Sequence, residues 1–467
     1  MTSTVTAGGT GTPIGTAEGL AGLRQPDDPG ASDWLNQYRA SAFEWLDRHG
    51  FPTAKNEDWK YFRLGAILAT PFRPGRSGQH PALSSAIIDN LVPDLGGPRL
   101  VFVNGHLRPE LSSIPGPETG VEVASLASIL ADQPSSPPPL FTTPGTDLLD
   151  GFAALNVGLA QDGACLRIAA GAVVAQPIQL VYCTAGAVDP VWSTTRSMVL
   201  AGAHSRATLV EAHVGIDDGS VCGTNAVTRI QLEPGAQLDH CMIQDAPPTA
   251  MHFGVLDVTQ AAGSRFSTWA FSLGAATARH EARLRLEGEG SDATLAGLYL
   301  PAGQQYHDNP VLVEHVAPNC TSRQVYNGVL DGRGHGVFNG RIVVQPTANG
   351  TDATQSNKNL VLSDQAEIDT RPRLEILTDD VACSHGATVG QLDDDAIYYL
   401  RSRGISEPAS RAMLTSAFAT EIVQRIEVDP LRDWVLRLVS QRLDAAALPE
   451  PGIGSPTDRS QTDRSPR

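Results

Sequence analysis

LRIAAGAVVAQPIQLVY, residues 166–182, shows the pattern that decides the fold: a β-prone run, a bend that contains glycine, and a second run with alternating apolar residues. The same arrangement recurs in MVLAGAHSRATLVEAHV (198–214), IQLEPGAQLDHCMI (230–243), TQAAGSRFSTWAF (259–271) and LRLEGEGSDATLAGLYL (284–300). Alternation with a period of two is typical of β-strands, because successive side chains point to opposite faces. Helical periodicity is almost absent from this part of the chain, so we expect it to consist of strands.

The bend glycines recur at a nearly regular spacing. Gly171, Gly202, Gly235, Gly263 and Gly290 are separated by 31, 33, 28 and 27 residues. Short strands at such a spacing indicate a β-solenoid, in which stacked coils bury an apolar row that no single coil could bury alone. A large β-sandwich or barrel also has alternating strands and remains the alternative.

Helical patterns flank this β region. We expect a flexible tail at 1–30, an N-terminal helical region at 31–97, a β core at 98–390, a C-terminal helical region at 391–447 and a second tail at 448–467. Both tails have the polar, Gly-, Pro- and Ser-containing composition of segments that cannot build a core. In the C-terminal region, Asp, Ser and Pro residues that favour helix starts precede runs with apolar residues on one face.

The charge and the cysteines exclude several classes of function. The 467 residues include 34 basic and 51 acidic side chains, for a net charge of −17. This acidic balance argues against nucleic acid or an anionic membrane as the main partner, and no stretch reaches the roughly 18 apolar residues of a spanning helix. The six cysteines form no C-x-x-C pair, which argues against zinc ribbons and suits a reducing, cytoplasmic setting. The plastid stroma is the alternative, should the N-terminus act as a transit peptide.

The segment DDVACSHGATVG (379–390) contains the most suggestive pair of side chains. In an extended chain Cys383 and His385 project from the same face, with Cα atoms about 7 Å apart. A thiolate and an imidazole at that distance could bind one metal or cluster. The alternative is structural: Cys383 packs as a small apolar residue and His385 caps a turn, since two ligands do not complete a site.

Other motifs favour structural roles. The glycine-rich DGRGHGVFNGR (331–341) is followed by a strand-like run rather than by the helix that a phosphate loop needs, so it predicts a turn. No G-x-x-x-x-G-K-[ST] motif is present, so the sequence gives no sign of ATP hydrolysis. His280-Glu281 lacks the second histidine of H-E-x-x-H, and we expect Trp59 to be a packing anchor.

Six longer words run in order from the N-terminal helical region to the C-terminal one: KNEDWKYF (55–62), LVFVNG (100–105), YNGVLDGRGHGVFNGRIVV (326–344), QSNKNLVLSDQAEIDTRPRLEI (355–376), CSHGATVGQLD (383–393) and AIYYLRSRGI (396–405). They resemble the SufB/SufD family, whose members are scaffold subunits of the Suf iron–sulfur cluster assembly machinery. The resemblance implies a mainly β fold, with a right-handed parallel β-helix core between N-terminal and C-terminal α-helical regions.

Within the family, the words KNEDWKY and CSHGATVG resemble the SufD branch more than the SufB branch. SufB carries a cysteine, proposed to hold the nascent cluster, where this chain has Asn359, and a glutamate where it has Gly386. The resemblance therefore implies a non-catalytic scaffold subunit that does not build a cluster alone. The resemblance also implies that ATPase activity belongs to a SufC partner.

The resemblance also implies partners and ligands. The chain would pair with a SufB-like subunit through the β-helix, dock SufC through its C-terminal helices, and receive sulfur from a donor through SufB. His385, with Cys383 beside it, would contribute to a transient iron–sulfur cluster or metal shared with SufB, and reduced flavin is a further ligand described for such complexes. From the helical pattern we expect the SufC-docking face to contain Tyr399, Met413, Phe418, Ile422 and Trp434.

Three alternatives stay open. The chain could be a purely structural arm that docks SufC, or a SufB-like subunit that has lost its cysteine and pairs with a true SufD. It could also be a β-helix carbohydrate-active enzyme, although such enzymes usually align several Asp, Lys or Arg side chains along one groove.

Overall fold

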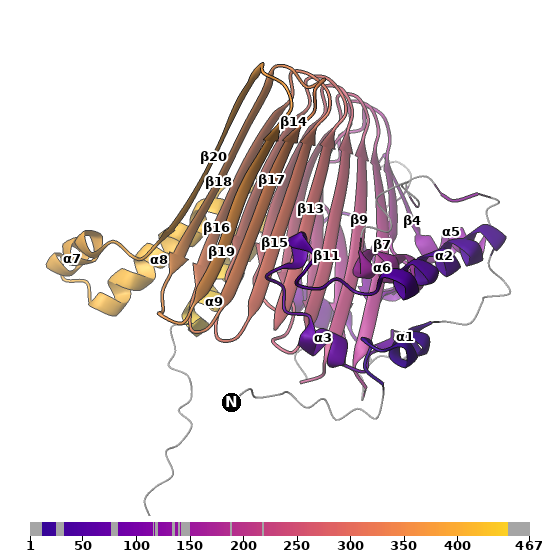
Figure 1. Cartoon of the computed structure of the whole chain (residues 1–467), viewed down its shortest axis with the longest axis horizontal. Helices are drawn as coiled ribbons and strands as arrows, with labels where there is room; N and C mark the ends of the chain where they lie inside the picture. Colours follow the sequence, from indigo (N-terminus) through magenta and orange to yellow (C-terminus); the bar gives the residue numbers. More distant parts are fainter. Residues whose placement is uncertain are drawn as a thin grey trace, which may run out of the picture.

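The computed structural model shows a long two-sheet solenoid with helices on both outer faces (Figure 1). It describes residues 12–24, 32–75, 83–114, 116, 120–132, 136–138, 141, 150–186, 189–216 and 219–446. None of the helices in these ranges is both long and apolar enough to cross a membrane.

Successive strands alternate between two parallel sheets. Sheet A contains β5 (Ala164–Ile168), β7 (Val191–Ala201), β9 (Cys222–Leu232), β11 (Met251–Gln260), β13 (Thr277–Leu286), β15 (Tyr306–His315), β17 (His335–Val344) and β19 (Glu367–Ile376). Sheet B contains β6 (Ile178–Thr184), β8 (Arg206–Gly215), β10 (Gln237–Asp245), β12 (Arg265–Ser272), β14 (Asp292–Tyr299), β16 (Thr321–Leu330), β18 (Thr351–Val361) and β20 (Val381–Gly390). Each strand pairs in parallel with the strand two positions along the chain, which confirms the β-solenoid and rules out the sandwich.

A ladder of left-handed residues lines the edge where the chain passes from sheet A to sheet B. Each of these residues donates its backbone N–H to a turn carbonyl of the next coil, at 2.8 to 3.2 Å. The ladder, with φ between 56° and 71°, consists of Gly171, His204, Gly235, Gly263, Gly290, Asn319 and Gly350. Glycine and asparagine tolerate this conformation best, which explains the recurring glycine in the sequence.

Four of the five predicted bend glycines occupy this ladder, and Gly202 is the exception. There the left-handed residue is His204, with φ 56°. Gly202 is required for a different reason, since an added Cβ would lie 2.6 Å from the Ile168 carbonyl oxygen of the preceding coil. The spacing of glycines therefore located the edge correctly but misplaced one turn by two residues.

The space between the sheets, here called the lumen, holds the main core. Leu209, Phe266, Leu284 and Phe338 belong to one continuous apolar cluster contributed by both sheets. Their burial removes apolar surface from water in every coil, which stabilises the stack.

A row of buried polar side chains also runs through the lumen. Glu211 accepts hydrogen bonds from His213 at 2.8 Å and from Thr228 at 3.0 Å, and His240 lies 3.5 Å from its other oxygen. Burial alone raises the pKa of Glu211, but the hydrogen bonds and charges of the two histidines outweigh it and hold the pKa below its ordinary value. Burial holds the pKa of His280 down to about 3, so this imidazole is neutral.

Helices cover the outer faces of both sheets. On sheet A lie α2 (Asp33–His49) and α6 (Gly151–Leu159), which share an apolar cluster with Trp192 and Phe253. On sheet B lie α4 (Ser85–Leu91), α8 (Glu407–Val423) and α9 (Asp429–Ala446), packed against Cys241 and Leu298. The helix α2 lies at the start of the expected N-terminal helical region.

Residues 55–63, here called the strap, cross the outer face of sheet A and include η1 (Glu57–Trp59). Trp59 is buried against Phe62 and Phe152, which confirms its predicted packing role. Glu57 accepts hydrogen bonds from Arg371 at 2.9 Å and from Arg373 at 3.1 Å. The strap therefore ties the N-terminal region to β19, the last strand of sheet A.

The first end of the solenoid is closed by antiparallel strands. β4 (Val121–Ser125) pairs with β5, and β3 (His106–Leu107) pairs with β2 (Arg99–Val103), which itself pairs in parallel with β6. The short elements around this end are η2 (Pro109–Leu111), α5 (Leu126–Ala131), α3 (Gly65–Ala69) and β1 (Arg73–Pro74).

Part of the expected N-terminal tail is ordered. Residues 12–24 contain α1 (Ala17–Leu23), capped by the Thr16 side chain, and Ile14 and Leu23 are fully buried in the cluster of α2 and Trp59. A helix of seven residues is too short to show a periodic pattern, so composition alone indicated a tail. Residues 1–11, 25–31 and the expected tail at 448–467 lie outside the described ranges.

Candidate functional site

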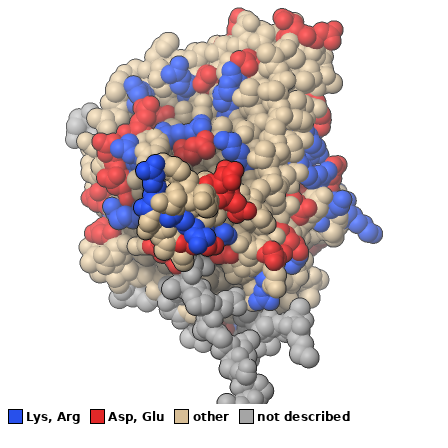
Figure 2. All heavy atoms as spheres, turned by 90° about the vertical axis from the view of Figure 1, so that its left-hand side faces the viewer, with Lys and Arg blue, Asp and Glu red and all other residues tan. Residues whose placement is uncertain are grey.

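The second end of the solenoid is open. β19 and β20 are the outermost described strands of their sheets, each paired on one side only. Ile376, Leu377 and Val389 expose 40%, 58% and 54% of their surface there. Figure 2 looks onto this side of the molecule and shows a broad uncharged area among scattered acidic and basic side chains. An unpaired edge with exposed apolar side chains is a surface that commonly pairs with another chain.

Cys383 and His385 lie on β20, at this open end. In the register of the sheet Cys383 is beside Ala353 and His385 is beside Gln355, both of which are buried in the lumen. Because side chains two residues apart share a face, both predicted residues point toward the mouth of the lumen. The structure confirms the extended segment and the shared face that the sequence predicted.

The two side chains differ in their surroundings. His385 is exposed, whereas Cys383 is half-buried against Ile342, Val344 and Ala353. Burial raises the pKa of the Cys383 thiol, so the thiol is protonated near neutral pH. The described residues contain no group of three or more His, Cys, Asp or Glu side chains arranged to hold a metal ion. This pair therefore offers one available imidazole and leaves any metal site incomplete.

A polar column leads from His385 into the lumen. Gln324, Gln355 and His385 occupy adjacent positions in the register of β16, β18 and β20. The side-chain amides of Gln324 and Gln355 are buried, and none of their nitrogen and oxygen atoms has a partner among the described residues. Unpartnered buried amides are costly, so this column suits water or a polar ligand that enters from the mouth.

Asn359 has a structural role beside the column. Its side chain accepts a hydrogen bond from Tyr299, and donates to Asn357 at 2.7 Å and to the Thr388 carbonyl of β20 at 3.3 Å. The residue is buried and satisfied, and it holds β20 in register. Gly386, two positions before Thr388, has open space where a Cβ would lie.

The C-terminal helices divide the predicted docking residues into two groups. Tyr399 on α7 (Asp394–Ser402) and Met413 on α8 expose 57% and 51% of their surface. Ile422 and Trp434 are buried in the cluster that attaches α8 and α9 to sheet B, and Phe418 is partly buried in it. The expected docking face thus loses Ile422 and Trp434, because the apolar face of an amphipathic helix is the one that packs on its own domain.

Comparison with known proteins identifies the family. A model of the SufBD core domain of SUF-system iron–sulfur cluster assembly proteins matches residues 183–418, and a model of the SufBD N-terminal region matches residues 27–180. The iron–sulfur cluster assembly protein SufD of Escherichia coli is 33% identical over 404 residues, covering 86% of this chain and 92% of the relative.

The chain belongs to the SufBD family.

Further relatives include a Synechocystis SufBD family protein, 29% identical over 86% of this chain and 90% of the relative, and the chloroplastic protein ABCI7 of Arabidopsis thaliana, 27% identical over 87% of this chain and 85% of the relative. The two SufBD models together span the region from just before α2 into α8, so the strap, the solenoid and the open end all lie in family-matched sequence. α9 lies beyond both matched ranges.

Sequence reasoning missed two features of this SufBD site. Tyr398, next to the predicted Tyr399, is the most exposed large side chain on α7, at 74%. The paired tyrosines after the capping Asp393 were a usable signal, because Ile397 takes the inward position of the same helix. The column of Gln324, Gln355 and His385 could not be predicted from the sequence. Alternation shows which residues of a strand face the lumen, but not which residues of neighbouring strands lie side by side.

Proposed function

We propose that this SufBD family protein is a SufD-like, non-catalytic scaffold subunit of an iron–sulfur cluster assembly complex, which pairs with a SufB-like subunit through its open end. The observation that carries the proposal is the unpaired edge of β19 and β20, with His385 exposed at its mouth. A SufB-like solenoid edge would continue the two sheets and cover Leu377 and Val389.

His385 is the residue we assign to the nascent cluster. An exposed imidazole can ligate iron. Because Cys383 is protonated and packed, it serves as a support for His385 rather than as a first ligand. The remaining ligands would come from thiolates of the SufB-like partner, and the cluster would be a transient cargo shared between the two subunits.

The test is anaerobic reconstitution of the whole complex. The chain is co-expressed with its SufB-like and SufC-like partners, and subunit mass, iron and sulfide are measured for wild type, His385→Ala and His49→Ala. His49 is an exposed histidine on α2, far from the open end, and serves as the matched control. We expect His385→Ala to assemble normally and to lose cluster loading, with no change for His49→Ala.

A complex whose iron and sulfide content is unaffected by His385→Ala would overturn the cluster role and leave a structural arm. That second candidate is favoured by one observation, the incomplete ligand set in the described residues. Failure of the wild-type chain to assemble would overturn the pairing itself. The membership in the SufBD family favours both readings over a carbohydrate-active enzyme.

We assign SufC docking to the exposed part of the C-terminal helices. α7 projects away from the body of the solenoid (Figure 1) and presents Tyr398 and Tyr399, while Met413 continues the surface on α8. Exposed aromatic residues are common anchors of protein interfaces. The ATPase cycle of SufC would then move α7 and α8, and through the contacts of α8 with Asn327 and Lys358 the motion would reach β16 and β18.

A further inference from the structure

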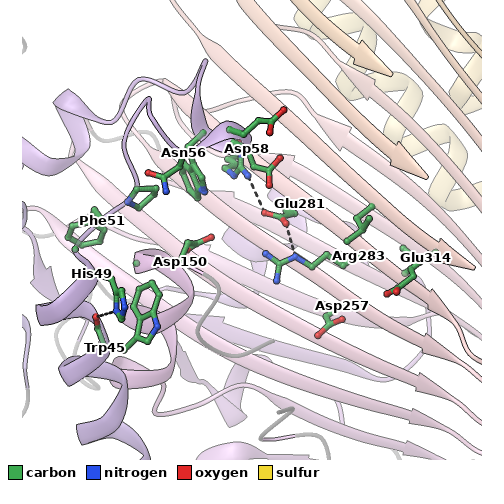
Figure 3. Close-up of a pocket in the computed structure, with 18 of the residues that line it drawn as sticks. Trp45, His49, Phe51, Asn56, Asp58, Asp150, Asp257, Glu281, Arg283 and Glu314 are labelled. Atoms are coloured by element: carbon green, nitrogen blue, oxygen red, sulfur yellow. Dashed lines mark hydrogen bonds and ion pairs between the residues drawn. The ribbon is translucent and has the colours of Figure 1, made fainter. Parts of the chain in front are cut away.

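A cavity that lies far from the open end is found on the outer face of sheet A. It has a volume of about 660 Å³ and is enclosed by the end of α2, the strap, the start of α6, and strands β11, β13 and β15 (Figure 3). This volume lies within the range of small-molecule sites, about 300 to 1,000 Å³. None of the roles proposed above uses it.

The floor of the cavity carries an ordered chain of charges. Glu281 bridges two arginines, accepting from Arg283 Nε at 2.6 Å and from Arg279 Nη2 at 3.2 Å. Arg279 also forms an ion pair with Asp308, and its guanidinium carbon lies 4.0 Å from the centroid of the Trp59 ring. Since these contacts satisfy Arg279 and Glu281, neither is available to a ligand.

Arg283 keeps an unused donor fork. Its side chain contacts Glu281 through Nε, and the two Nη groups have no acceptor within the described residues. Figure 3 shows the guanidinium extending into the cavity on the side of Asp150. The side chain is only 12% exposed, which holds the fork in a fixed direction. A planar fork of this kind matches a carboxylate through two parallel hydrogen bonds.

Asp150 provides an unused acceptor across the cavity. Its Oδ1 caps α6 by accepting from the backbone of Phe152 at 2.8 Å and of Ala153 at 2.9 Å, while Oδ2 has no partner among the described residues. Burial and the nearby Glu281 raise the pKa of Asp150, and Arg283 opposes this through electrostatic attraction, yet no contact within 4 Å joins Asp150 and Arg283. A donor fork and an acceptor therefore face the same space without a direct ion pair between them.

The opposite wall is aromatic. The rings of Trp45 and His49 stack with centroids 4.4 Å apart, and Phe51 continues this wall toward Phe152, 5.0 Å away. Such a wall favours a flat or long apolar group. It completes a cavity with one cationic, one anionic and one apolar contact region.

We propose that this cavity binds a zwitterionic α-amino acid with an aromatic side chain, its carboxylate on Arg283, its ammonium on Asp150 and its side chain against Trp45 and Phe51. A purely anionic ligand would face Glu281, Asp257 and Glu314 on the floor. A purely cationic ligand would face Arg283 and Arg285. A zwitterion brings both charges and no net charge, so it satisfies both unused groups.

The first test uses wild-type protein and needs no variant. Binding of L-phenylalanine is measured by calorimetry, together with 3-phenylpropionate, which lacks the ammonium, and phenethylamine, which lacks the carboxylate. We expect L-phenylalanine to bind and each analogue to bind at least about tenfold more weakly, because each leaves one buried charge unpaired. Equal binding of all three compounds, or no binding of L-phenylalanine up to about 10 mM, overturns the proposal.

The second test assigns the contacts. Asp150→Asn keeps a residue that caps helices well, so α6 is preserved while the negative charge is lost. Asp393→Asn makes the same change at the cap of α7, outside the cavity, and is the matched control. We expect Asp150→Asn to weaken L-phenylalanine binding by tenfold or more and to leave 3-phenylpropionate unaffected, with no effect of Asp393→Asn. An equal loss for both compounds, or an equal loss in the control, contradicts the assigned contact.

Discussion

At position 297 the backbone of β14 passes directly against the ring of Tyr326. A Cβ added to Gly297 would lie 2.1 Å from Tyr326 Cε1, and Tyr326 is buried in the lumen. Gly297→Ala should therefore lower the free energy of unfolding by about 1 to 3 kcal/mol, the usual range for overpacking. Urea denaturation measures it, with Gly386→Ala as control, because nothing lies within 4 Å of the Cβ at that position. An unchanged midpoint for Gly297→Ala would show that Tyr326 can move aside.

The buried histidines predict how stability depends on pH. Burial lowers the pKa of His307 from 6.5 to about 4, so the unfolded chain takes up the proton first as the pH falls. The stabilisation from the neutral imidazole is complete above pH 6.5 and is lost toward pH 4, at a cost of roughly 3 kcal/mol for this group. His307→Gln should reduce the slope of unfolding free energy against pH by about one proton in this window. The exposed His49→Gln is the control, and equal slopes for wild type and His307→Gln would contradict the assignment.

Individual residues were only partly predictable from the sequence. The cap at Asp393 and the shared face of Cys383 and His385 followed from local rules. The partial burial of Cys383 did not, because it depends on Ile342 and Val344, some 40 residues earlier in the chain. The same holds for Glu211, whose pKa is lowered by His213 and also by His240 in the next coil.

The strap contacts residues that lie more than 300 positions later in the sequence. Glu57 and Asp58 bind Arg371 and Arg373, and the acids are about 60% exposed. Exposed ion pairs contribute at most about 1 kcal/mol each, so Glu57→Gln with Asp58→Asn should change global stability little. The pairs hold β19 at the edge of its sheet, however, so amide exchange in β19 should become several-fold faster while β11 is unchanged. Hydrogen exchange by mass spectrometry measures both strands. Asp47→Asn, which breaks the remote ion pair with Arg24, is the control. If β19 exchanged at the same rate in the Glu57/Asp58 variant as in wild type, the ion pairs of the strap would not hold β19 in place.

For the helices, the sequence predicts where each one starts but not which surface it packs against. The starts of α7, α8 and α9 were predictable from Asp393, Ser406 and Asp429. Which surface each apolar face covers was not, and so Ile422 and Trp434 were expected to dock a partner although they attach the helices to sheet B. The short helix α1 was missed because one buried turn with Leu20 and Leu23 has no periodic signal.

At the scale of the whole molecule, stability should fall from the closed end toward the open end. Each coil contacts only its neighbours, so the last coil is supported from one side. The residues of β19 and β20 are exposed or half-buried, whereas all but one residue of β7 and all but one residue of β9 are buried. We expect amide protection to decrease steadily from β9 to β20 in the isolated chain, and to rise in β19 and β20 when the SufB-like partner is added. Uniform protection along the solenoid would contradict both the gradient and the proposed interface.

The architecture as a whole was the most predictable level. Alternation and the recurring bends were enough to indicate stacked coils. Each repeated turn requires a left-handed backbone conformation, which favours glycine at positions such as Gly235, Gly263 and Gly290. The polar lumen and the cavity under the strap were not predictable, since both are formed by segments that no local pattern relates.

The strap also sets an order of events in time. Glu57 and its partner Arg371 are 314 residues apart in the chain. At a synthesis rate of about 5 to 20 residues per second, the N-terminal segment has left the ribosome roughly 15 to 60 seconds before β19 exists. Each coil can stack on its predecessor as it emerges, and Trp59 can pack on Phe152 as soon as α6 has emerged, but the ion pairs of the strap cannot form before β19 exists. Attachment of the strap to β19 is therefore a late step, and a newly made chain passes through a long interval in which its solenoid grows while Glu57 and Asp58 have no partner on β19.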